Sequence, residues 1–516
     1  MSIYNKIKKI FGKRKMEDGF DGMTKEKTVT IFFAPNSADL KKCIKECVAI
    51  PESYDFYRID GLLSKLKDSL VFYIESPYID SHYRDTYYSY YASKFQDYER
   101  MCLRVHIFSE EVQDAIKDED KRYLGYFIVR PLPSHPLGRS FIAPVAFKND
   151  SFLCCLCKQS INLLGVHLSV CAFPHIVQDE ETHKCAESVV WMLLSYFGTK
   201  FCSYNTLLPS EIRRKIDSIS RHRLLPSNGL TLEEITVCLN STNHNCLYYL
   251  FDDNSSDKVL YFIVMRIYIE SGMPFIVAYT DEHGANHVAL AVGHDDIDFD
   301  AIHAEFTKYC DKCWHDVSTY KKQLVFMDDN FPQYVVDNCE EEISRYKPKM
   351  NYKIRGFIVP THRHMHMDAL GAFKLMNTIF DEKNTGLASL VNGRWITRLF
   401  LTSGKSFKHS LIDDTVIDDV HREYFLSMLL PKFIWVCELY DECSYKPNVN
   451  NVQVCSGILV LDATEIGAVS SVLACYIEDW YYENMGTYLN PMKTEFSFRK
   501  KAYKHNLKGA WNEWQD

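Results

Sequence analysis

Short apolar runs alternate with polar helical stretches through the first third of the chain, over residues 26–165. Apolar runs bounded by turn residues are typical of strands. The strands we expect here are Val29–Phe33, Leu70–Ile74, Leu103–Phe108 and Tyr123–Val129. A proline-stiffened segment, Pro131 to Pro136, then interrupts the pattern near a domain boundary. The sequence predicts a mixed N-terminal domain in which no residue pattern is typical of catalysis.

After Gln178 the pattern changes to a polar loop and then an apolar helix that begins at Cys185 and closes at Gly198. Its apolar face consists of Ala186, Val189, Val190, Leu193, Leu194 and Phe197. The strands that we expect next are Pro274–Tyr279, His287–Val292, Leu324–Met327 and Ile354–Val359. A helix followed by antiparallel strands is the α+β order. We therefore expect a central α+β domain over residues 166–385.

The remaining residues, 386–516, continue the same mixture of elements. The expected elements are the strands Trp395–Leu401, Phe433–Leu439 and Val452–Leu461 and an apolar helical stretch near Ile466–Ile477. This order predicts a C-terminal α+β extension. Three units agree with the length of 516 residues, because a single hydrophobic core stops growing at roughly 250 to 300 residues.

The composition argues for a folded protein without nucleic acid as a partner. Hydrophobic residues make up 47% of the chain and charged residues 25%, as in ordinary globular proteins. The net charge is −9, and the basic residues are scattered except at the N-terminus, so we expect no binding of DNA or RNA. Many of the 18 cysteines lie in apolar segments, and no secretory signal is visible. We therefore expect reduced thiols and a cytoplasmic protein.

The first 25 residues form a basic tail with the pattern of a short amphipathic helix. Its apolar positions are Ile3, Ile7, Ile10 and Phe11. Lysine and arginine occupy most of the positions between them. Such a segment is compatible with a weak peripheral membrane contact, and equally with a frayed, solvated tail.

Cys185 has the position that a catalytic thiol requires. A cysteine attacks as its thiolate, which the N-terminus of a helix stabilises. A base must then face this helix from a rigid strand, and His287, which opens the run HVALAVG, fits that requirement. His283 and His294 are the competing histidines nearby.

Two further residues complete the candidate site. Asp328 follows the strand Leu324–Met327 and is placed to orient the imidazole of His287. Asp329 is an alternative, because adjacent residues on an extended strand point to opposite faces. Upstream, the side-chain amide of Gln178 is a candidate donor to an oxyanion, beside the backbone N–H of Cys185.

Three strings carry a resemblance to a known family. The run QDEETHKCAESVVWMLLSYFG resembles the nucleophile segment of papain-like cysteine peptidases related to the bacterial bacteriocin-leader-processing (double-glycine) type. The runs GMPFIVAYTDEHGANHVALAVGHD and VFMDDNFPQY resemble that group's histidine strand and aspartate turn. The spacing from Gln178 to Cys185 is one residue longer than is usual in papain-like enzymes, and Ala186 and Glu187 replace the commoner glycine.

The resemblance implies a central papain-like cysteine-hydrolase domain in which a nucleophile helix packs on an antiparallel sheet. It implies Cys185 as nucleophile, His287 as base, Asp328 as orienting group and Gln178 in the oxyanion hole. We expect a peptidase that acts on a peptide or protein through a thioester, without a metal or cofactor. An acyltransferase or transglutaminase-like activity and a catalytically silent scaffold or sensor are the alternatives.

Three other patterns are weaker candidates for functional sites. Cys310 and Cys313, with two histidines nearby, provide only half of a zinc site, so we expect ordinary thiols. The alternating His362, His364 and His366 fit an exposed strand or loop better than a metal site. The aromatic-rich segment at residues 87–91 fits packing better than recognition.

Overall fold

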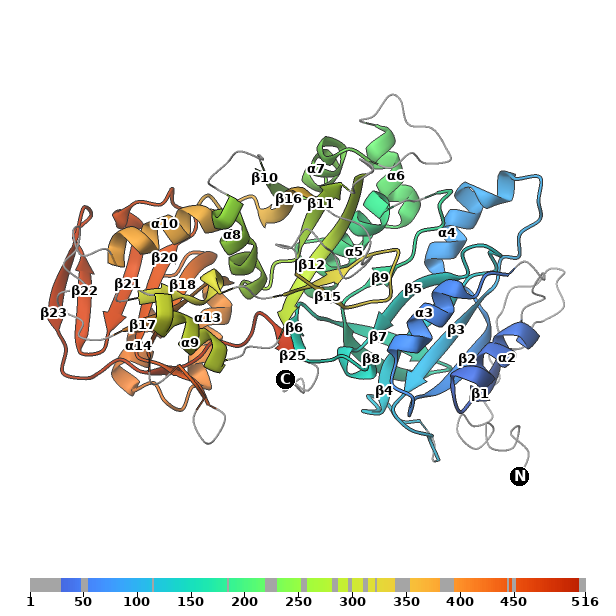
Figure 1. Ribbon diagram of the computed structural model, residues 1–516, viewed down its shortest axis with the longest axis horizontal. Coiled ribbons are helices and arrows are strands. Elements are labelled where there is room, and N and C mark those ends of the chain that lie inside the picture. The colour runs from blue at the N-terminus through green and yellow to red at the C-terminus, as the bar shows by residue number, and fades with distance from the viewer. Residues whose placement is uncertain are drawn as a thin grey trace.

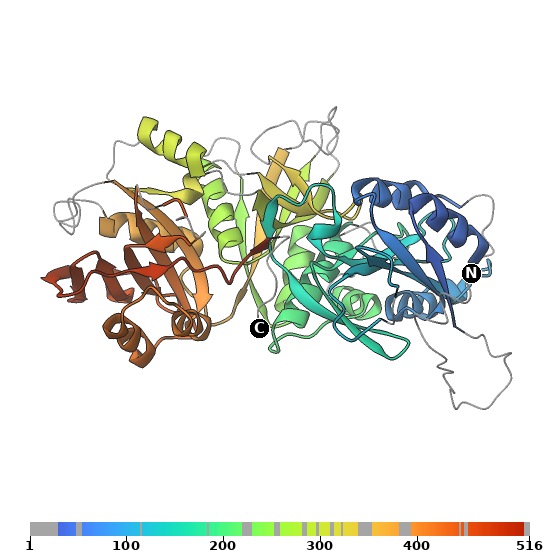
Figure 2. The ribbon, with the colours of Figure 1, turned by 90° about the horizontal axis from the view of Figure 1, so that it is seen from below.

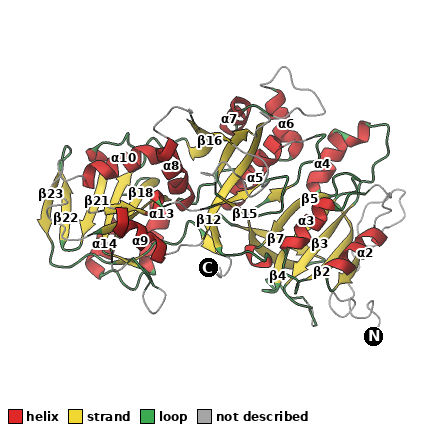
Figure 3. Cartoon of the chain, viewed as in Figure 1, coloured by secondary structure: helices red, strands yellow, loops and turns green. Residues whose placement is uncertain are grey.

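The computed structural model describes residues 29–47, 54–113, 116–182, 185–218, 230–251, 258–280, 286–295, 299–309, 314–320, 323–338, 353–380, 394–442, 445–447 and 452–509. Within them, three large β-sheets stand in a row along the longest axis, with helices packed around them (Figures 1 and 3). The view from below shows the same row, with the first and third sheets at opposite ends and the C-terminus near the middle (Figure 2). The fold is thus a mixture of helices and mainly antiparallel sheets, as the order of elements predicts.

The first sheet has the strand order β1-β2-β3-β4-β5-β9, and all its pairs are antiparallel. Its strands are β1 (Thr30–Ala34), β2 (Val71–Tyr78), β3 (Cys102–Phe108), β4 (Tyr123–Val129), β5 (Leu137–Ile142) and β9 (His175–Ile176). The accompanying helices are α2 (Ser37–Cys47), α3 (Tyr57–Lys65), α4 (Ser81–Ser89), η1 (Tyr91–Ser93) and η2 (Pro144–Ala146). A separate hairpin consists of β7 (Cys157–Leu163) and β8 (Val166–Ala172). The four strands predicted in this region all form.

The central sheet has the order β10-β16-β11-β12-β14-β15, and the short strands β6 and β25 join it at β12. Its strands are β6 (Phe152–Cys154), β10 (His244–Leu250), β11 (Phe275–Thr280), β12 (Asn286–Asp295), β14 (Leu324–Met327), β15 (Val335–Asp337), β16 (Lys353–His362) and β25 (Lys508–Gly509). The helices beside it are α5 (Cys185–Lys200), α6 (Pro209–Asp217), α7 (Leu232–Asn240) and α8 (Lys258–Glu270). The antiparallel strands predicted after the helix are present in this sheet.

Helix α5 begins at Cys185 and runs through the interior. Every residue from Ala186 to Phe197 is buried, because the helix packs against β12, β9, α6 and α7. A helix that is apolar on most sides belongs in the interior. The predicted end at Gly198 was wrong, since α5 continues to Lys200. Gly198 instead permits a close approach: a Cβ there would lie 2.6 Å from the backbone nitrogen of Thr206.

The third sheet has the order β13-β17-β18-β20-β21-β22-β23. Its strands are β13 (Trp314–Asp316), β17 (Trp395–Ser403), β18 (Phe433–Asp441), β20 (Gly457–Asp462), β21 (Val472–Ile477), β22 (Trp480–Asn484) and β23 (Leu489–Lys493), with β19 (Val454–Cys455) and β24 (Lys500–Lys501) paired beside it. Its helices are α9 (Phe299–Tyr309), α10 (Ala369–Phe380), α13 (Gly404–Ile412), α14 (Asp419–Ser427), η3 (Val317–Thr319) and η4 (Val469–Ser471). Strand β18 is buried on both faces: Trp435 and Cys437 join the main core, whereas Ile434 and Val436 join a second core.

The helix predicted near Ile466–Ile477 was wrong. The segment contains only the short helix η4 and then β21, which pairs with β20 along its length. A short, wholly apolar run has no period that separates a buried helix from a buried strand. The segment Val472–Ile477 forms a strand because the edge of β20 provides hydrogen-bond partners for its backbone.

The sheets exchange strands across the boundaries predicted at residues 165 and 385. The β7–β8 hairpin spans residue 165, and β13 pairs with β17 of the third sheet. Strand β25, near the end of the chain, returns to β6 in the central sheet (Figure 1). The tail over residues 1–25 lies outside the described residues. No helix in the described part of the chain is long and apolar enough to cross a membrane.

Candidate active site

Cys185 is the first residue of α5, and its side chain is partly exposed at the edge of the main core. The N-terminus of a helix carries a partial positive charge, which favours a thiolate there. Burial raises the pKa of other thiols in the chain, among them Cys102, Cys154 and Cys437. Cys185 is therefore in a different environment from the buried structural thiols.

His287 lies near the beginning of β12, where the strand is fixed by its neighbour β11. It pairs with Tyr279 across the two strands, and the two rings meet edge to face with centroids 5.4 Å apart. The side chain of His287 is 18% exposed. This placement holds the imidazole on a rigid strand while leaving one side open.

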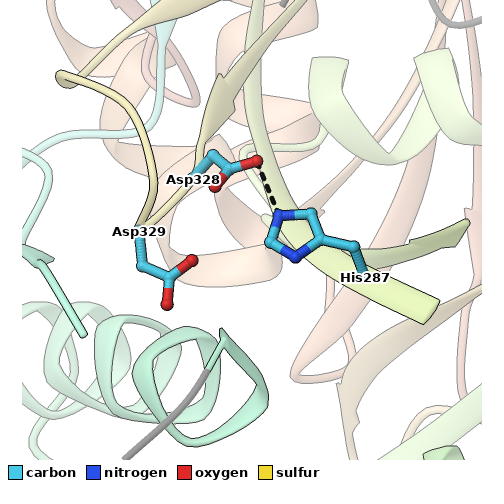
Figure 4. A group of neighbouring side chains, drawn as sticks. All are labelled: His287, Asp328 and Asp329. Carbon is cyan, nitrogen blue, oxygen red and sulfur yellow. Dashed lines mark hydrogen bonds and ion pairs between the residues drawn. The ribbon is translucent and has the colours of Figure 1, made fainter. Parts of the chain in front are cut away.

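Asp328 follows the last residue of β14 and reaches His287. The register pairs Leu290 of β12 with Met327 of β14, which brings Asp328 alongside the start of β12. Its Oδ2 lies 2.8 Å from Nε2 of His287 (Figure 4). Figure 4 also shows the second ring nitrogen, Nδ1, directed away from Asp328. With Nε2 occupied, Nδ1 is the atom that remains for Cys185.

The imidazole of His287 favours its protonated form. Burial lowers the pKa of His287, but the charge and hydrogen bond of Asp328, together with a hydrogen bond and the charge of Cys185, raise it well above its ordinary value. The net direction shows that the two partners outweigh desolvation. Asp328 and Cys185 thus both act on the imidazole of His287, Asp328 through the 2.8 Å hydrogen bond.

Asp328 is itself firmly held. Its side chain is 2% exposed, and Oδ1 accepts a hydrogen bond of 2.9 Å from the backbone N–H of Asn330. Its Oδ2 also accepts from the Tyr279 hydroxyl at 3.4 Å. Burial raises the pKa of Asp328, but the charge and hydrogen bond of His287 and the hydrogen bond from the backbone N–H of Asn330 lower it overall. The carboxylate therefore stays ionised beside the imidazole.

Asp329 is fully buried and differs from Asp328 in its contacts. Neither of its carboxylate oxygens makes a hydrogen bond of ordinary geometry, although Ser188 of α5 is close enough to lower its pKa. Burial, and then the charge of Asp328, raise the pKa of Asp329 to about 7. Of the two adjacent acids, only Asp328 is hydrogen-bonded to His287 (Figure 4).

Gln178 lies on the loop before α5, and its side-chain amide is hydrogen-bonded to the loop that follows β14. Its Nε2 donates to Oδ1 of Asn330 at 2.5 Å. The same loop is ordered by Asp179, which accepts hydrogen bonds from Thr182 (backbone, 2.8 Å) and from the Tyr91 hydroxyl (3.1 Å). Sequence patterns could not predict the bond between Gln178 and Asn330 or that between Tyr91 and Asp179, because each pair lies far apart in the chain.

The side chains of His287, Asp328 and Asp329 are also close enough for a cation. Their ligand atoms lie within 4.8 Å of one another. His287 and Asp328 are already hydrogen-bonded to each other at 2.8 Å, however, and Cys185 also raises the pKa of the same ring. We therefore interpret the group as an oriented imidazole rather than a metal centre.

The other patterns noted in the sequence do not converge on this site. Cys310 and Cys313 lie outside the described residues. Nε2 of His362 lies 3.1 Å from the ammonium nitrogen of Lys432, a cation that disfavours a metal ion there. Two residues of the aromatic segment have a structural role, because the hydroxyls of Tyr90 and Tyr91 donate to Glu181 and Asp179 of the loop before α5.

No known protein-family model matches this chain, and no curated protein sequence matches it. The chemistry of the site has therefore to be inferred from its own residues. Those residues place a thiol, an imidazole and a carboxylate in series at the start of a buried helix.

Proposed function

We propose that the central part of the chain, residues 166–385, is a papain-like cysteine hydrolase that cleaves a peptide or isopeptide bond in a peptide or protein substrate. The observation that supports this most directly is the series Cys185, His287, Asp328. The thiol lies at a helix N-terminus, the base on a facing strand and the orienting acid behind the base. This is the arrangement that nucleophilic catalysis by a thiol requires.

In the first half of the reaction, the thiolate of Cys185 attacks the carbonyl carbon of the scissile bond. The electrons of the C=O bond move to oxygen, and a tetrahedral oxyanion forms. When the intermediate collapses, the C–N bond breaks, and Nδ1 of His287 gives its proton to the leaving amine. A thioester with Cys185 remains, and His287 is now neutral.

In the second half, His287 takes a proton from water as the water attacks the thioester carbonyl. The C–S bond breaks and releases a carboxylic acid, and the thiolate and imidazolium are restored. Asp328 does not exchange a proton in either half. It holds the ring with Nδ1 toward the thiol and stabilises the positive charge of the imidazolium.

The backbone N–H of Cys185 at the helix start would donate to the oxyanion. A primary amide carries two N–H donors, and Gln178 uses one of them on Asn330. Its second N–H is the donor that we assign to the oxyanion. The bond to Asn330 fixes the side chain before substrate binds, so little reorganisation is needed during the reaction.

Two alternatives use the same residues. If an amine replaces water in the second half, the enzyme is an acyltransferase, including the transglutaminase-like case. If the thiolate is not reactive, the domain is a scaffold or sensor.

The described cysteines are all free thiols, which supports a reducing compartment such as the cytoplasm.

Labelling of the full-length protein with iodoacetamide near pH 7, mapped by mass spectrometry, tests the proposal. We expect Cys185 to react at least about 10-fold faster than Cys202, an exposed cysteine that serves as the internal reference. His287→Ala should reduce the difference, and Cys185→Ala should remove the fast site. Labelling in the presence of EDTA should be unchanged, because no step requires a metal.

The opposite result would be equal labelling of Cys185 and Cys202 that His287→Ala leaves unaltered. It would favour the scaffold over the hydrolase. A positive result should be followed by mass spectrometry of the thioester with peptide libraries. Addition of an amine nucleophile then separates hydrolysis from acyl transfer by the mass of the product.

A further inference from the structure

Arg58 contacts the candidate site from another part of the molecule. It lies on α3, beside the first sheet, and its side chain is 17% exposed. Its Nη1 donates to the backbone oxygen of Asp329 at 2.9 Å, although the two residues are 271 positions apart. Its Nη2 lies 3.4 Å from Oδ1 of Asn330. The guanidinium of Arg58 therefore binds the loop that follows Asp328 at two points.

The same guanidinium reaches the loop before the nucleophile helix. Nη2 of Arg58 lies 3.7 Å from Oε1 of Glu180, and Nε2 of His135 lies 3.2 Å from the same oxygen. The two loops are also joined directly by the hydrogen bond between Gln178 and Asn330. Arg58 thus lies where the loop before Cys185 meets the loop after β14.

A second side chain of the first sheet acts in the same way. Nε2 of His175, on β9, lies 3.0 Å from the backbone oxygen of Asp328. His175 is fully buried, and burial lowers its pKa to about 4, so it is neutral at pH 7 and donates one N–H. The carbonyl group of Asp328 is therefore held by a side chain of the first sheet, and that of Asp329 by a side chain of α3 beside this sheet. Two anchored peptide groups in succession fix the direction of the Asp328 carboxylate.

We propose that the first sheet is an integral part of the hydrolase and that Arg58 is its positioning residue, which aligns the loops of Gln178 and Asp328 on Cys185 and His287. This inference rests on the proposed function. It assigns a role to the N-terminal part of the chain, in which no residue pattern is typical of catalysis. Arg58 does not touch the reacting atoms, and it acts through Asp329, Asn330 and Glu180.

The geometry requires arginine at this position. The planar guanidinium presents several N–H donors in a fixed fork, so it can serve a backbone oxygen, an amide oxygen and a carboxylate together. A lysine keeps the positive charge but offers one compact ammonium on a flexible chain. Arg58→Lys therefore retains the charge and removes the shared geometry.

The test compares full-length wild type, Arg58→Lys and Asn330→Ala, with Arg84→Lys as the matched control. Arg84 is an exposed arginine on α4, beside the same sheet. Two quantities are measured as a function of pH: the rate of Cys185 alkylation by iodoacetamide, and the imidazole titration of His287 by NMR, assigned with His287→Ala. We expect both Arg58→Lys and Asn330→Ala to slow alkylation at pH 7 about 10-fold, since small misplacements in active sites have effects of this size or larger.

The same two variants should move the His287 titration toward its ordinary pKa, whereas Arg84→Lys should match wild type in both measurements. Wild-type rates and titrations in both variants, with the fold intact by circular dichroism, would overturn the proposal. Asn330 is exposed, so its variant remains informative if Arg58→Lys fails to fold.

If Cys185 of the wild type is unreactive, the proposed function fails. The His287 titration still decides whether Arg58 positions Asp328.

Discussion

The hydrogen bond between Nε2 of His287 and Oδ2 of Asp328 is 2.8 Å long, and it distinguishes Asp328 from the adjacent acid, Asp329. Asp329 comes next in the chain and is equally buried, but it has no hydrogen bond to the ring. The orientation of the imidazole therefore depends on Asp328. The two acids provide a matched pair for mutation, because asparagine has nearly the shape of either.

We predict that Asp328→Asn lowers kcat/KM, or the alkylation rate of Cys185 where no substrate is known, by about 100-fold or more. Asparagine carries no charge to stabilise the imidazolium, and its single acceptor oxygen cannot serve both the ring and the backbone N–H of Asn330. Asp329→Asn should change the same rate by less than about 3-fold. The measurement is a rate at fixed pH on both variants. A larger loss in Asp329→Asn than in Asp328→Asn would reverse the assignment.

The pH dependence of turnover should report the raised pKa of His287. Protonation of the leaving amine requires the imidazolium, and Asp328 and Cys185 hold the pKa of His287 above its ordinary 6.5. Activity should therefore persist above pH 6.5 and decline only as pH rises through the raised pKa. In Asp328→Asn the decline should move to lower pH. A decline at the same pH in both proteins would show that Asp328 does not set it.

The sequence was sufficient for those features that depend on local pattern. The strands Tyr123–Val129 and Leu324–Met327 have the predicted bounds, and α5 begins at Cys185 as expected. Alternation, turn residues and a polar loop before an apolar helix are signals contained within a few residues of one another. The order of helix and strands in the central part follows from the same signals.

Sequence patterns could not predict which segments pair with each other over long distances in the chain. The segment Val472–Ile477 became a strand because β20 offers it a partner, and no local pattern records that partner. The contact of Arg58 with Asp329 and that of Gln178 with Asn330 join residues that are 271 and 152 positions apart in the chain. The spacing of residues could not show which of Asp328 and Asp329 contacts His287. The chain leaves β14 at this point, and the direction of each carboxylate depends on the backbone carbonyl groups that His175 and Arg58 hold.

Asp329→Asn should stabilise the protein at alkaline pH. Burial and Asp328 raise the pKa of Asp329 from 3.8 to about 7. The folded state therefore binds the proton more tightly than the unfolded state, and this contribution to stability, complete below about pH 4, is lost as pH rises through 7. Asparagine does not ionise, so at pH 8 the variant should exceed wild type by on the order of 4 kcal/mol.

Urea denaturation at pH 5 and pH 8 measures this effect. The advantage of Asp329→Asn should be clearly smaller at pH 5 than at pH 8. Asp419→Asn is the control, because the Asp419 side chain is 97% exposed and should show no comparable gain. An advantage of equal size at the two pH values would mean that the Asp329 carboxyl does not titrate between them.

Arg398 links the central and third sheets through buried charges. Its Nε lies 3.1 Å from Oε2 of Glu270, at the end of α8, and its Nη1 lies 3.1 Å from Oε2 of Glu438, on β18. Both glutamates are buried, and Glu438 also pairs with Lys500 at 2.5 Å. Removal of the guanidinium takes one charged partner from each glutamate, while Glu270 keeps His294 at 3.1 Å and Glu438 keeps Lys500. A buried charge that loses its partner is costly, so Arg398→Met should destabilise the protein by about 3–5 kcal/mol.

Denaturation and hydrogen exchange together test this prediction. Because Glu270 belongs to the central sheet's helix and Glu438 to the third sheet, exchange should accelerate in both α8 and β18 of Arg398→Met. Addition of Glu270→Gln removes one of the uncompensated charges and should recover part of the loss. A change confined to β18, with no recovery in the double variant, would show that the contact with Glu270 contributes nothing to the joining of the two sheets.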